Sequence, residues 1–386
     1  MPDKLLRIDN TPRPYPWGVT DGIADLLGRP RTGAVEAELW LGSHPGSPSR
    51  VLGPAPWPDL AAWEEYADRP LPFLLKVLAA DRPLSLQAHP TAAQAAAGFA
   101  REDAAGIPVD DPGRNYPDPR AKPELIVAAR DGFEALCGFR EVAESLATLD
   151  ALAPQAAGRG GLGRWRELLA ADGLRACLAW LLSGSGEITE MLDELPAGRS
   201  ALLDRLRAAY PGDPGVAVAL LLNHVVLAAG EALYLPAGNI HTYLRGVGVE
   251  LMGPSDNVLR GGLTAKHVDR AELLAILDLR SGPPQPLTPY RLGPNARSYR
   301  PRRHPAGRDV DFELVEVSGP IELTTTSAAV LLVLDGGFTA DAGGERLEIG
   351  RGQAALVAGP DAVGLTGRGR LYLAATGVRP RPPVSS

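Results

Sequence analysis

The sequence predicts a mainly β protein with a helical insertion. Residues 1–140 contain short apolar stretches separated by Pro and Gly, the pattern of strands and turns. Residues 141–212 instead repeat apolar side chains at i, i+3, i+4 and i+7, which predicts helices. Strand patterns return after Gly230, and residues 310–377 are β throughout, typical of a small sandwich or barrel. A helical block between two β-rich stretches indicates an insertion into one β domain.

The individual elements follow from local patterns taken in chain order. In the first β-rich stretch the clearest strands are expected at 37–43, 72–80, 83–90 and 123–129. Apolar periodicity predicts helices at 141–152, 163–184, 187–195 and 198–210, and one more apolar helix over roughly 215–227. Strands resume in 231–253. We therefore expect the domains 1–140 with 215–276, 141–214 and 310–386, with the Pro-, Arg- and Gly-rich residues 277–309 as a linker.

Composition excludes several classes of partner. The formal net charge of -7 argues against a nucleic-acid binder, which would carry a basic face. The longest apolar stretch is interrupted by Asn223 and His224, so no membrane span is expected. The N-terminus lacks the apolar core of a signal peptide, and Cys137 and Cys177 form no short motif. We expect a cytoplasmic protein with free, buried thiols, either a monomer or a weak homo-oligomer.

Four residues in separate stretches could form a metal site. In "SLQAHP" strand alternation places Ser85, Gln87 and His89 on one face. Glu124 follows Pro123 near a strand start, and His241 follows the turn "PAGN". Two imidazoles, one carboxylate and one amide oxygen suit Zn²⁺, with Mn²⁺, Fe²⁺ or Co²⁺ possible. The spacing alone equally allows hydrogen-bonded strand and turn residues without a metal, so both interpretations stay open at this point.

Lysine usage points to the same stretches. Only four of the 39 basic residues are lysine, and three of them, Lys76, Lys122 and Lys266, lie in or beside the candidate strands and motifs. Those positions are candidates for a compact ammonium that arginine cannot replace. Lys266 belongs to "VELMGPSDNVLRGGLTAKH", which also holds Glu250 and Arg260 among glycines. Such a segment can bind phosphate or an oxyanion, although a polar surface loop has the same composition.

Several of these stretches together resemble a known family. "YPWG", "AELWLGSHP", "LPFLLKVLAADRPLSLQAHP", "KPELIVA" and "HTYLRGVGVELMGPSDNVLRGGLTAKHVD" are similar, in order, to type I mannose-6-phosphate isomerases, also called phosphomannose isomerases. The resemblance implies a cupin-type β-barrel (jelly-roll) catalytic domain, an α-helical domain and a second cupin-like β domain. It implies one Zn²⁺ per chain and an isomerase that interconverts mannose 6-phosphate and fructose 6-phosphate through a cis-enediol. The zinc ligands it implies are Gln87, His89, Glu124 and His241.

The resemblance also implies a sugar-phosphate pocket. Arg260, Lys122 and Lys266 are expected to line it, with Lys76, Ser85, Trp17, Tyr243 and Glu250 nearby. We expect Glu250 or Lys122 to be the general base, while Arg260 is hard to deprotonate and suits an oxyanion. Many family members carry His before the Lys-Pro-Glu motif, where this chain has Ala121, so a mechanism that needs that histidine cannot operate here.

Two other functions are compatible with these patterns. One is a non-catalytic sugar-phosphate-binding cupin with a structural metal, for which three retained cations would be unnecessary. The other is a metal-dependent cupin oxygenase, whose His-rich facial ligand set fits a glutamine poorly. The remaining histidines are expected outside the chemistry, with His44 in a turn, His224 in an apolar helix, His267 directed away from Lys266 and His304 in the surface linker.

Overall fold

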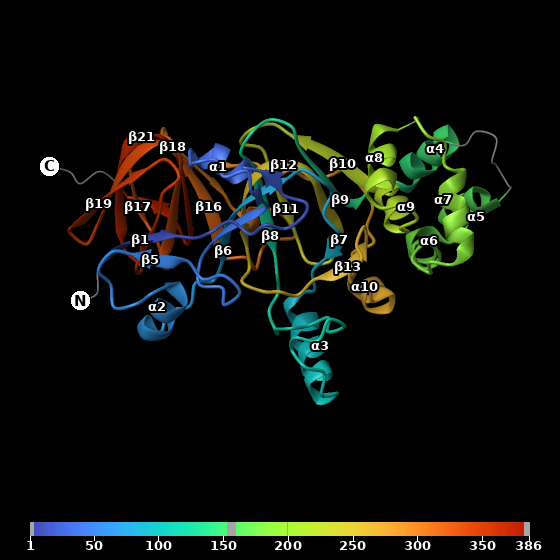
Figure 1. Cartoon of the computed structure of the whole chain (residues 1–386), viewed down its shortest axis with the longest axis horizontal. Coiled ribbons are helices and arrows are strands. Elements are labelled where there is room, and N and C mark those ends of the chain that lie inside the picture. The colour runs from blue at the N-terminus through green and yellow to red at the C-terminus, as the bar shows by residue number, and fades with distance from the viewer. Residues whose placement is uncertain (1–3, 153–159, 199, 382–386) are drawn as a thin grey trace.

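The computed structural model describes residues 4–152, 160–198 and 200–381. More of the described residues lie in strands than in helices, and the strands gather in two large antiparallel sheets that lie side by side (Figure 1). Most of the helices form a block at the far end of one sheet, on the side away from the other sheet (Figure 1). The predicted mainly β architecture is confirmed.

The first sheet is built around the long strand β12 (His241–Met252). In the part of the chain that the structure describes this sheet has nine strands, with β12 paired to β6, β7, β8 and β9. The other strands are β4 (Glu38–Leu41), β6 (Leu74–Ala80), β7 (Leu86–Ala88), β8 (Glu124–Ala128), β9 (Phe133–Phe139), β10 (Leu222–Leu227), β11 (Ala232–Leu235) and β13 (Leu259–Gly262). The predicted strands at 37–43, 72–80, 83–90 and 123–129 are all present, and each buries aliphatic side chains such as Leu39, Val77, Leu86 and Val127 in the core.

The second sheet is centred on the long paired strands β18 (Ala329–Ala342) and β21 (Ala362–Thr376). Its other C-terminal strands are β16 (Phe312–Val317), β17 (Ile321–Thr324), β19 (Glu345–Gly350), β20 (Ala354–Val357) and β22 (Arg379–Pro380). Two strands from the N-terminus, β1 (Leu5–Asp9) and β5 (Arg50–Leu52), extend this sheet through the pairing of β1 with β20. The local pattern of β1 does not reveal that its partner is about 350 residues away along the chain.

Residues 277–309 are more structured than the expected linker. They contain β14 (Tyr290–Gly293), β15 (Ala296–Tyr299) and the 3₁₀ turn η1 (Pro301–Arg303). Strand β15 pairs with β16, so this stretch joins the second sheet. Its Arg and Pro residues suggested solvent exposure, but Ala296, Ser298 and Tyr299 in β15 are buried. The two sheets pack through a shared apolar core that includes Tyr299.

The helical block consists of α4 (Val142–Leu152), α5 (Gly160–Ala171), α6 (Gly173–Leu181), α7 (Gly186–Glu194), α8 (Ala201–Ala209) and α9 (Gly215–Leu220). These helices pack on a core formed with the first sheet. The prediction of a helix over 215–227 is wrong in its second half, because the chain enters β10 at Leu222. His224 therefore lies in a strand in which half-buried and exposed residues alternate, and its Nε2 is 3.4 Å from Glu134. The apolar residues on either side of Asn223 and His224 fit either structure, and pairing with β9 decides for the strand.

Four helices outside the block were not predicted. They are α1 (Gly22–Leu27), α2 (Leu60–Ala67), α3 (Ala92–Ala104) and α10 (Arg270–Ile276). Helix α3 begins with a capping box in which Thr91 and Gln94 exchange hydrogen bonds, a signal that the sequence already carries. A small pair, β2 (Val19–Thr20) and β3 (Val35–Glu36), flanks α1. Both cysteines are free and buried, as expected, and no described helix is long and apolar enough to cross a membrane.

Candidate metal centre and active-site cavity

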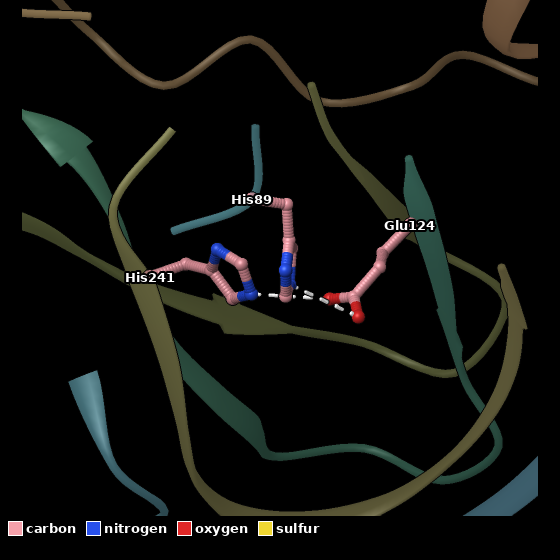
Figure 2. A group of neighbouring side chains, drawn as sticks. All are labelled: His89, Glu124 and His241. Atoms are coloured by element: carbon pink, nitrogen blue, oxygen red, sulfur yellow. Dashed lines mark hydrogen bonds and ion pairs between the residues drawn. The ribbon is translucent and has the colours of Figure 1, made fainter. Parts of the chain in front are cut away.

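Three buried side chains meet inside the first sheet. His89 follows β7, Glu124 begins β8 and His241 begins β12, so three strand ends bring together residues that are far apart in the sequence (Figure 2). One ligand atom from each lies within 4.8 Å of the others. Each of the three residues is at most 2 % exposed. The predicted convergence of these residues is therefore present in the structure.

Hydrogen bonds orient both imidazoles towards a common point. His89 Nδ1 lies 2.7 Å from the carbonyl oxygen of Asn257, and His241 Nδ1 lies 3.0 Å from that of Asn239. Because a carbonyl oxygen only accepts, each Nδ1 carries the hydrogen and, in a neutral ring, each Nε2 presents a lone pair. Burial lowers the pKa of His89 to about 4, so its ring is neutral near pH 7.

The lone pairs face an ionised carboxylate. The Nε2 atoms of His89 and His241 lie 3.2 and 3.1 Å from the two oxygens of Glu124. Burial alone would raise the pKa of Glu124, but the Lys122 ammonium 3.1 Å away helps to hold that pKa well below its usual value. Among the described residues, the buried His89 Nε2 has no hydrogen-bond partner. Acceptors that face one another in a buried site are unfavourable unless a cation lies between them, so this donor set fits a divalent metal.

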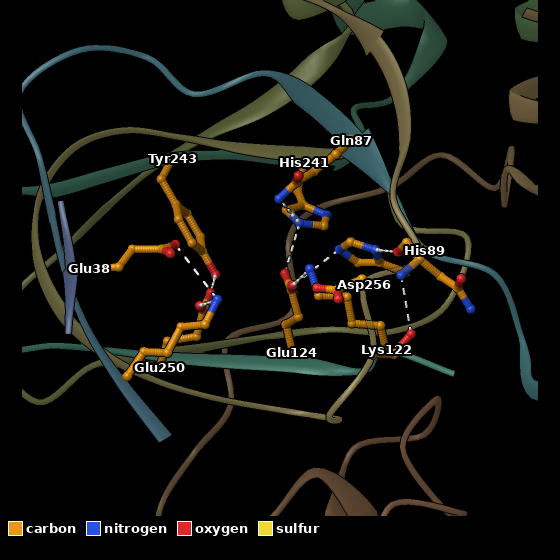
Figure 3. Close-up of polar contacts among 12 residues, drawn as sticks. Glu38, Gln87, His89, Lys122, Glu124, His241, Tyr243, Glu250 and Asp256 are labelled. Atoms are coloured by element: carbon orange, nitrogen blue, oxygen red, sulfur yellow. Dashed lines mark hydrogen bonds and ion pairs between the residues drawn. The ribbon is translucent and has the colours of Figure 1, made fainter. Parts of the chain in front are cut away.

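Gln87 completes the ring of polar groups. The register of β7 and β12 places Gln87 opposite His241, and its amide nitrogen lies 3.3 Å from His241 Nε2 (Figure 3). The nitrogen and oxygen of a terminal amide exchange places by rotation about the last side-chain bond, so either atom can face the centre. The alternation read from "SLQAHP" is also correct for the opposite face, where Leu86 and Ala88 are fully buried in the core.

A cavity of about 400 Å³ opens beside this centre. It is lined by every residue that was expected to contact a substrate, namely Trp17, Lys76, Ser85, Lys122, Tyr243, Glu250, Arg260 and Lys266. Gln87 and Glu124 form part of the same wall, so the metal-binding groups and the cavity make one site.

One side of the cavity carries two cations. Burial lowers the pKa of the Arg260 guanidinium, and burial together with Arg260 lowers the pKa of Lys266. Among the residues that the structure describes, neither side chain forms an ion pair with a carboxylate. Two neighbouring cations without acidic partners, partly withdrawn from water, favour the binding of an anion.

The opposite side carries a compact network of carboxylates around one lysine. Lys76 Nζ lies 3.6 Å from both Glu38 and Glu250, and the charges of these two groups raise the pKa of Lys76 against the effect of burial. The Tyr243 hydroxyl donates a 2.9 Å hydrogen bond to Glu250. Burial, with the Glu124 carboxylate as the next cause, raises the pKa of Glu250 to about 7. Glu250 is therefore a carboxyl group that changes its charge near neutral pH.

Some residues of the site were not singled out by their sequence patterns. Glu38, Tyr15 and Tyr210 line the cavity, and His44 Nε2 pairs with Asp256 at 3.2 Å. Glu38 lies in a strand that the pattern did predict, and its place opposite Leu78 on β6 depends on strand register. His44 was expected to be a turn residue, and its partner lies more than 200 residues away. Tyr210 comes from the helical block, which no local motif connects to the site.

The remaining histidines lie away from this cavity. His267 does not line it, in agreement with the expectation. His304 was expected in the surface linker, but its ring packs edge-on against Tyr234 and lines a different cavity of about 420 Å³. Burial lowers the pKa of His304.

Comparison with known proteins gives a consistent assignment. A family model described as phosphomannose isomerase type I, catalytic domain, matches residues 5–142. The mannose-6-phosphate isomerase of Escherichia coli (strain K12) is 34 % identical over 393 residues, which covers 95 % of this chain and 98 % of the relative. The mannose-6-phosphate isomerase of Bos taurus is 32 % identical, with 79 % of each chain covered.

Solved structures agree over almost the whole length. A mannose 6-phosphate isomerase bound with zinc and yttrium aligns with a TM-score of 0.84 at 32 % identity, covering 97 % of this chain and 100 % of the other. The Salmonella typhimurium mannose 6-phosphate isomerase bound to substrate (f6p) and zinc aligns with a TM-score of 0.85 at 32 % identity and the same coverage. With this extent of similarity in sequence and structure, the chain belongs to the family of type I mannose-6-phosphate isomerases.

Proposed function

We propose that the protein is a zinc-dependent aldose–ketose isomerase that interconverts mannose 6-phosphate and fructose 6-phosphate through a cis-enediol. The observation that carries this proposal is one cavity whose lining includes Gln87 and Glu124, which adjoin the buried His89 and His241, and also Arg260 and Lys266, which have no acidic partner among the described residues. A sugar phosphate needs both features, because its carbonyl end must be polarised while its phosphate end is anchored. The family relatives that bear this name, and the zinc- and f6p-bound Salmonella structure, support the same assignment.

Gln87, His89, Glu124 and His241 would hold the zinc ion. Two neutral imidazoles, an amide oxygen and one carboxylate leave the centre with a net positive charge of about one. When bound there, zinc supplies Lewis acidity towards sugar oxygens that gain negative charge. The carbonyl groups of Asn257 and Asn239 fix the two imidazole rings before any ligand arrives, so their orientation costs nothing at the time of binding.

Arg260 and Lys266 would anchor the phosphate group. Binding energy from this remote, unreacting end positions C1 and C2 of the sugar beside the reacting groups. Partial burial strengthens the attraction, because water screens these charges less than it would on the surface. The walls formed by Trp17 and Tyr243 limit how the sugar chain can lie, and the Ser85 hydroxyl offers a hydrogen bond to one of its hydroxyl groups.

Glu250 is the general base that the geometry favours. A carboxyl group with a pKa near the working pH can take a proton from one carbon and return it to the next. Tyr243 orients it, and Lys76 compensates its charge after ionisation. Lys122 is the second candidate, but its amino group is already engaged in an ion pair with Glu124 at 3.1 Å. Neither candidate requires a histidine where the chain has Ala121.

The proposed layout follows the family resemblance. We propose that the first sheet forms a cupin-type barrel from residues 1–140 and 215–276, with 141–214 as a helical insertion and 310–386 as a second cupin-like domain. The antiparallel pairing of both sheets supports it. The second sheet also contains β1, β5, β14 and β15, so it includes strands from outside residues 310–386. A cytoplasmic location and a monomer or weak homo-oligomer remain part of the proposal, and sedimentation velocity would test the latter.

A coupled assay tests the function directly. Purified protein is incubated with fructose 6-phosphate, and mannose 6-phosphate is measured before and after treatment with a chelator and after zinc is added back. We expect turnover that chelation abolishes and zinc restores. Full turnover by the metal-free protein would refute the metal dependence. Binding of the sugar phosphate without turnover would favour a non-catalytic binding protein, and oxygen consumption would favour an oxygenase.

A further inference from the structure

The segment that carries the two cavity cations is held by the helical block. Arg260 lies in β13, and the chain then turns through Gly262 and Leu263 towards Lys266. Leu263 has a φ of 53°, a left-handed conformation that is unfavourable for a leucine. It is nevertheless buried, at 1 % exposure, in the core shared with the helices. A strained conformation of this kind persists only where neighbouring groups fix it.

Asp213, between α8 and α9, supplies the fixing contact. Its Oδ2 accepts the amide hydrogen of Thr264 at 3.1 Å, directly after the strained residue. The hydroxyl of Thr264 in turn accepts the amide hydrogen of Lys266 at 3.1 Å. A chain of two hydrogen bonds therefore runs from the helical block to the backbone of a cavity cation. The second oxygen of Asp213 accepts from the amide of Gly215 at 2.7 Å, which closes a local turn.

Close backbone packing supports the same contact. A Cβ atom on Gly262 would lie 2.6 Å from the Cα of Gly215, and one on Gly215 would lie 2.6 Å from the amide nitrogen of Leu263. The two backbones thus approach to a distance that only glycine allows. Tyr210 lies three residues before Asp213. Its hydroxyl donates a 2.7 Å hydrogen bond to the carbonyl of Pro83, just before the cavity residues Ser85 and Gln87.

We propose that Asp213 is a positioning residue that holds the segment Arg260–Lys266 in the geometry needed to bind the anionic group of the substrate. Through this carboxylate the helical block at the end of the first sheet (Figure 1) contributes to substrate affinity, although Asp213 itself does not line the cavity. This inference rests on the proposed function, because it takes the anion at Arg260 and Lys266 to be the phosphate of a sugar phosphate.

The isosteric variant Asp213→Asn separates this role from local folding. Asparagine keeps an oxygen for the Gly215 amide, but its NH₂ group would face the Thr264 amide, donor against donor. The matched control is Asp204→Asn in α8, because Asp204 also accepts a loop amide, that of Gly198 at 3.2 and 3.0 Å, and does not line the cavity. For each protein we would measure the dissociation constant of inorganic phosphate by titration calorimetry, KM and kcat for fructose 6-phosphate, and bound zinc.

The expected signature is specific to anion binding. Asp213→Asn should weaken phosphate binding and raise KM together by about tenfold, the effect of losing a hydrogen bond to a charged group, with zinc content unchanged and a smaller change in kcat. Thr264→Val removes the next link and should give the same signature, and the double variant should be no worse than the worse single variant. Asp204→Asn should bind phosphate like the wild type.

Wild-type phosphate affinity in Asp213→Asn would overturn the inference, as would an equal loss in Asp204→Asn. Because calorimetry needs no turnover, absence of isomerase activity in the wild type would instead reject the proposed function, while the difference in phosphate affinity between the variants would still decide the role of Asp213.

Discussion

Replacing Tyr243 by phenylalanine should change the pH dependence of the reaction in a predictable direction. The Tyr243 hydroxyl donates a 2.9 Å hydrogen bond to Glu250, whose pKa is raised to about 7. This bond favours the ionised carboxylate, so its loss raises the pKa of Glu250 further. A hydrogen bond to a charged group contributes about 1.5–3 kcal/mol, and one pKa unit corresponds to about 1.4 kcal/mol, so we expect a rise of about one to two units.

The measurement is kcat/KM for fructose 6-phosphate as a function of pH. If Glu250 must be ionised to act as the base, the acidic limb of the profile should move to higher pH by about one to two units in Tyr243→Phe. Activity well above the new pKa should return towards the wild-type value. The matched control is Tyr116→Phe, because the Tyr116 hydroxyl also donates to a carboxylate, that of Glu272 at 2.6 Å, and does not line the cavity.

An acidic limb that stays in place in Tyr243→Phe would refute the assignment of Glu250 as the base. The same conclusion would follow if activity fell by one factor at every pH, since a lost packing contact or a misplaced substrate has no reason to depend on pH. A shifted limb in the Tyr116→Phe control would show that the profile responds to global stability.

Three further predictions concern the metal, the anion and the helical block. His89→Ala should lose bound zinc and turnover together, whereas Arg260→Ala should keep its zinc and lose turnover. Metal analysis beside the coupled assay distinguishes the two variants. Loss of zinc in both would contradict the division of the site into metal ligands and anion-binding cations. Gln87→Glu should keep zinc but lower kcat, because a second carboxylate weakens the Lewis acid, and an unchanged kcat would count against that role. Glu134→Gln should lower the free energy of unfolding by about 1–3 kcal/mol, because this carboxylate pairs with Arg205 of α8 and a second arginine on β12. Burial would raise the pKa of Glu134, but these arginines lower it below the unfolded value of 4.5. The stability that the ionised Glu134 contributes is therefore present above pH 4.5 and is lost as the pH falls towards the folded-state pKa. The unfolding free energies of wild type and variant, measured by chemical denaturation, should converge in acid.

The helix predicted over 215–227 ends at Leu220 and is followed by a strand, which shows where local patterns stop being informative. Residues 216–222 are all buried, so their hydrophobicity carries no period that separates a helix from a strand. The chain leaves α9 at Leu221 because β9 offers a free edge for the next six residues. The capping box of α3, by contrast, was readable from Thr91 and Gln94, and the helix was missed because the surrounding prolines and glycines favoured turns.

The sequence by itself determined the chemistry of the candidate site. The alternation in "SLQAHP", the place of Glu124 after Pro123 near a strand start, and the retention of three lysines select residues through their chemical type and spacing, which are local properties. Tertiary structure alone decided which groups act on one another. The orientation of the His89 ring depends on the carbonyl of Asn257, far away in the chain, the raised pKa of Glu250 depends on burial among residues from other strands, and the place of Asp213 depends on packing between the helical block and β13. These are effects of distance and desolvation, and the sequence encodes them only through the complete fold.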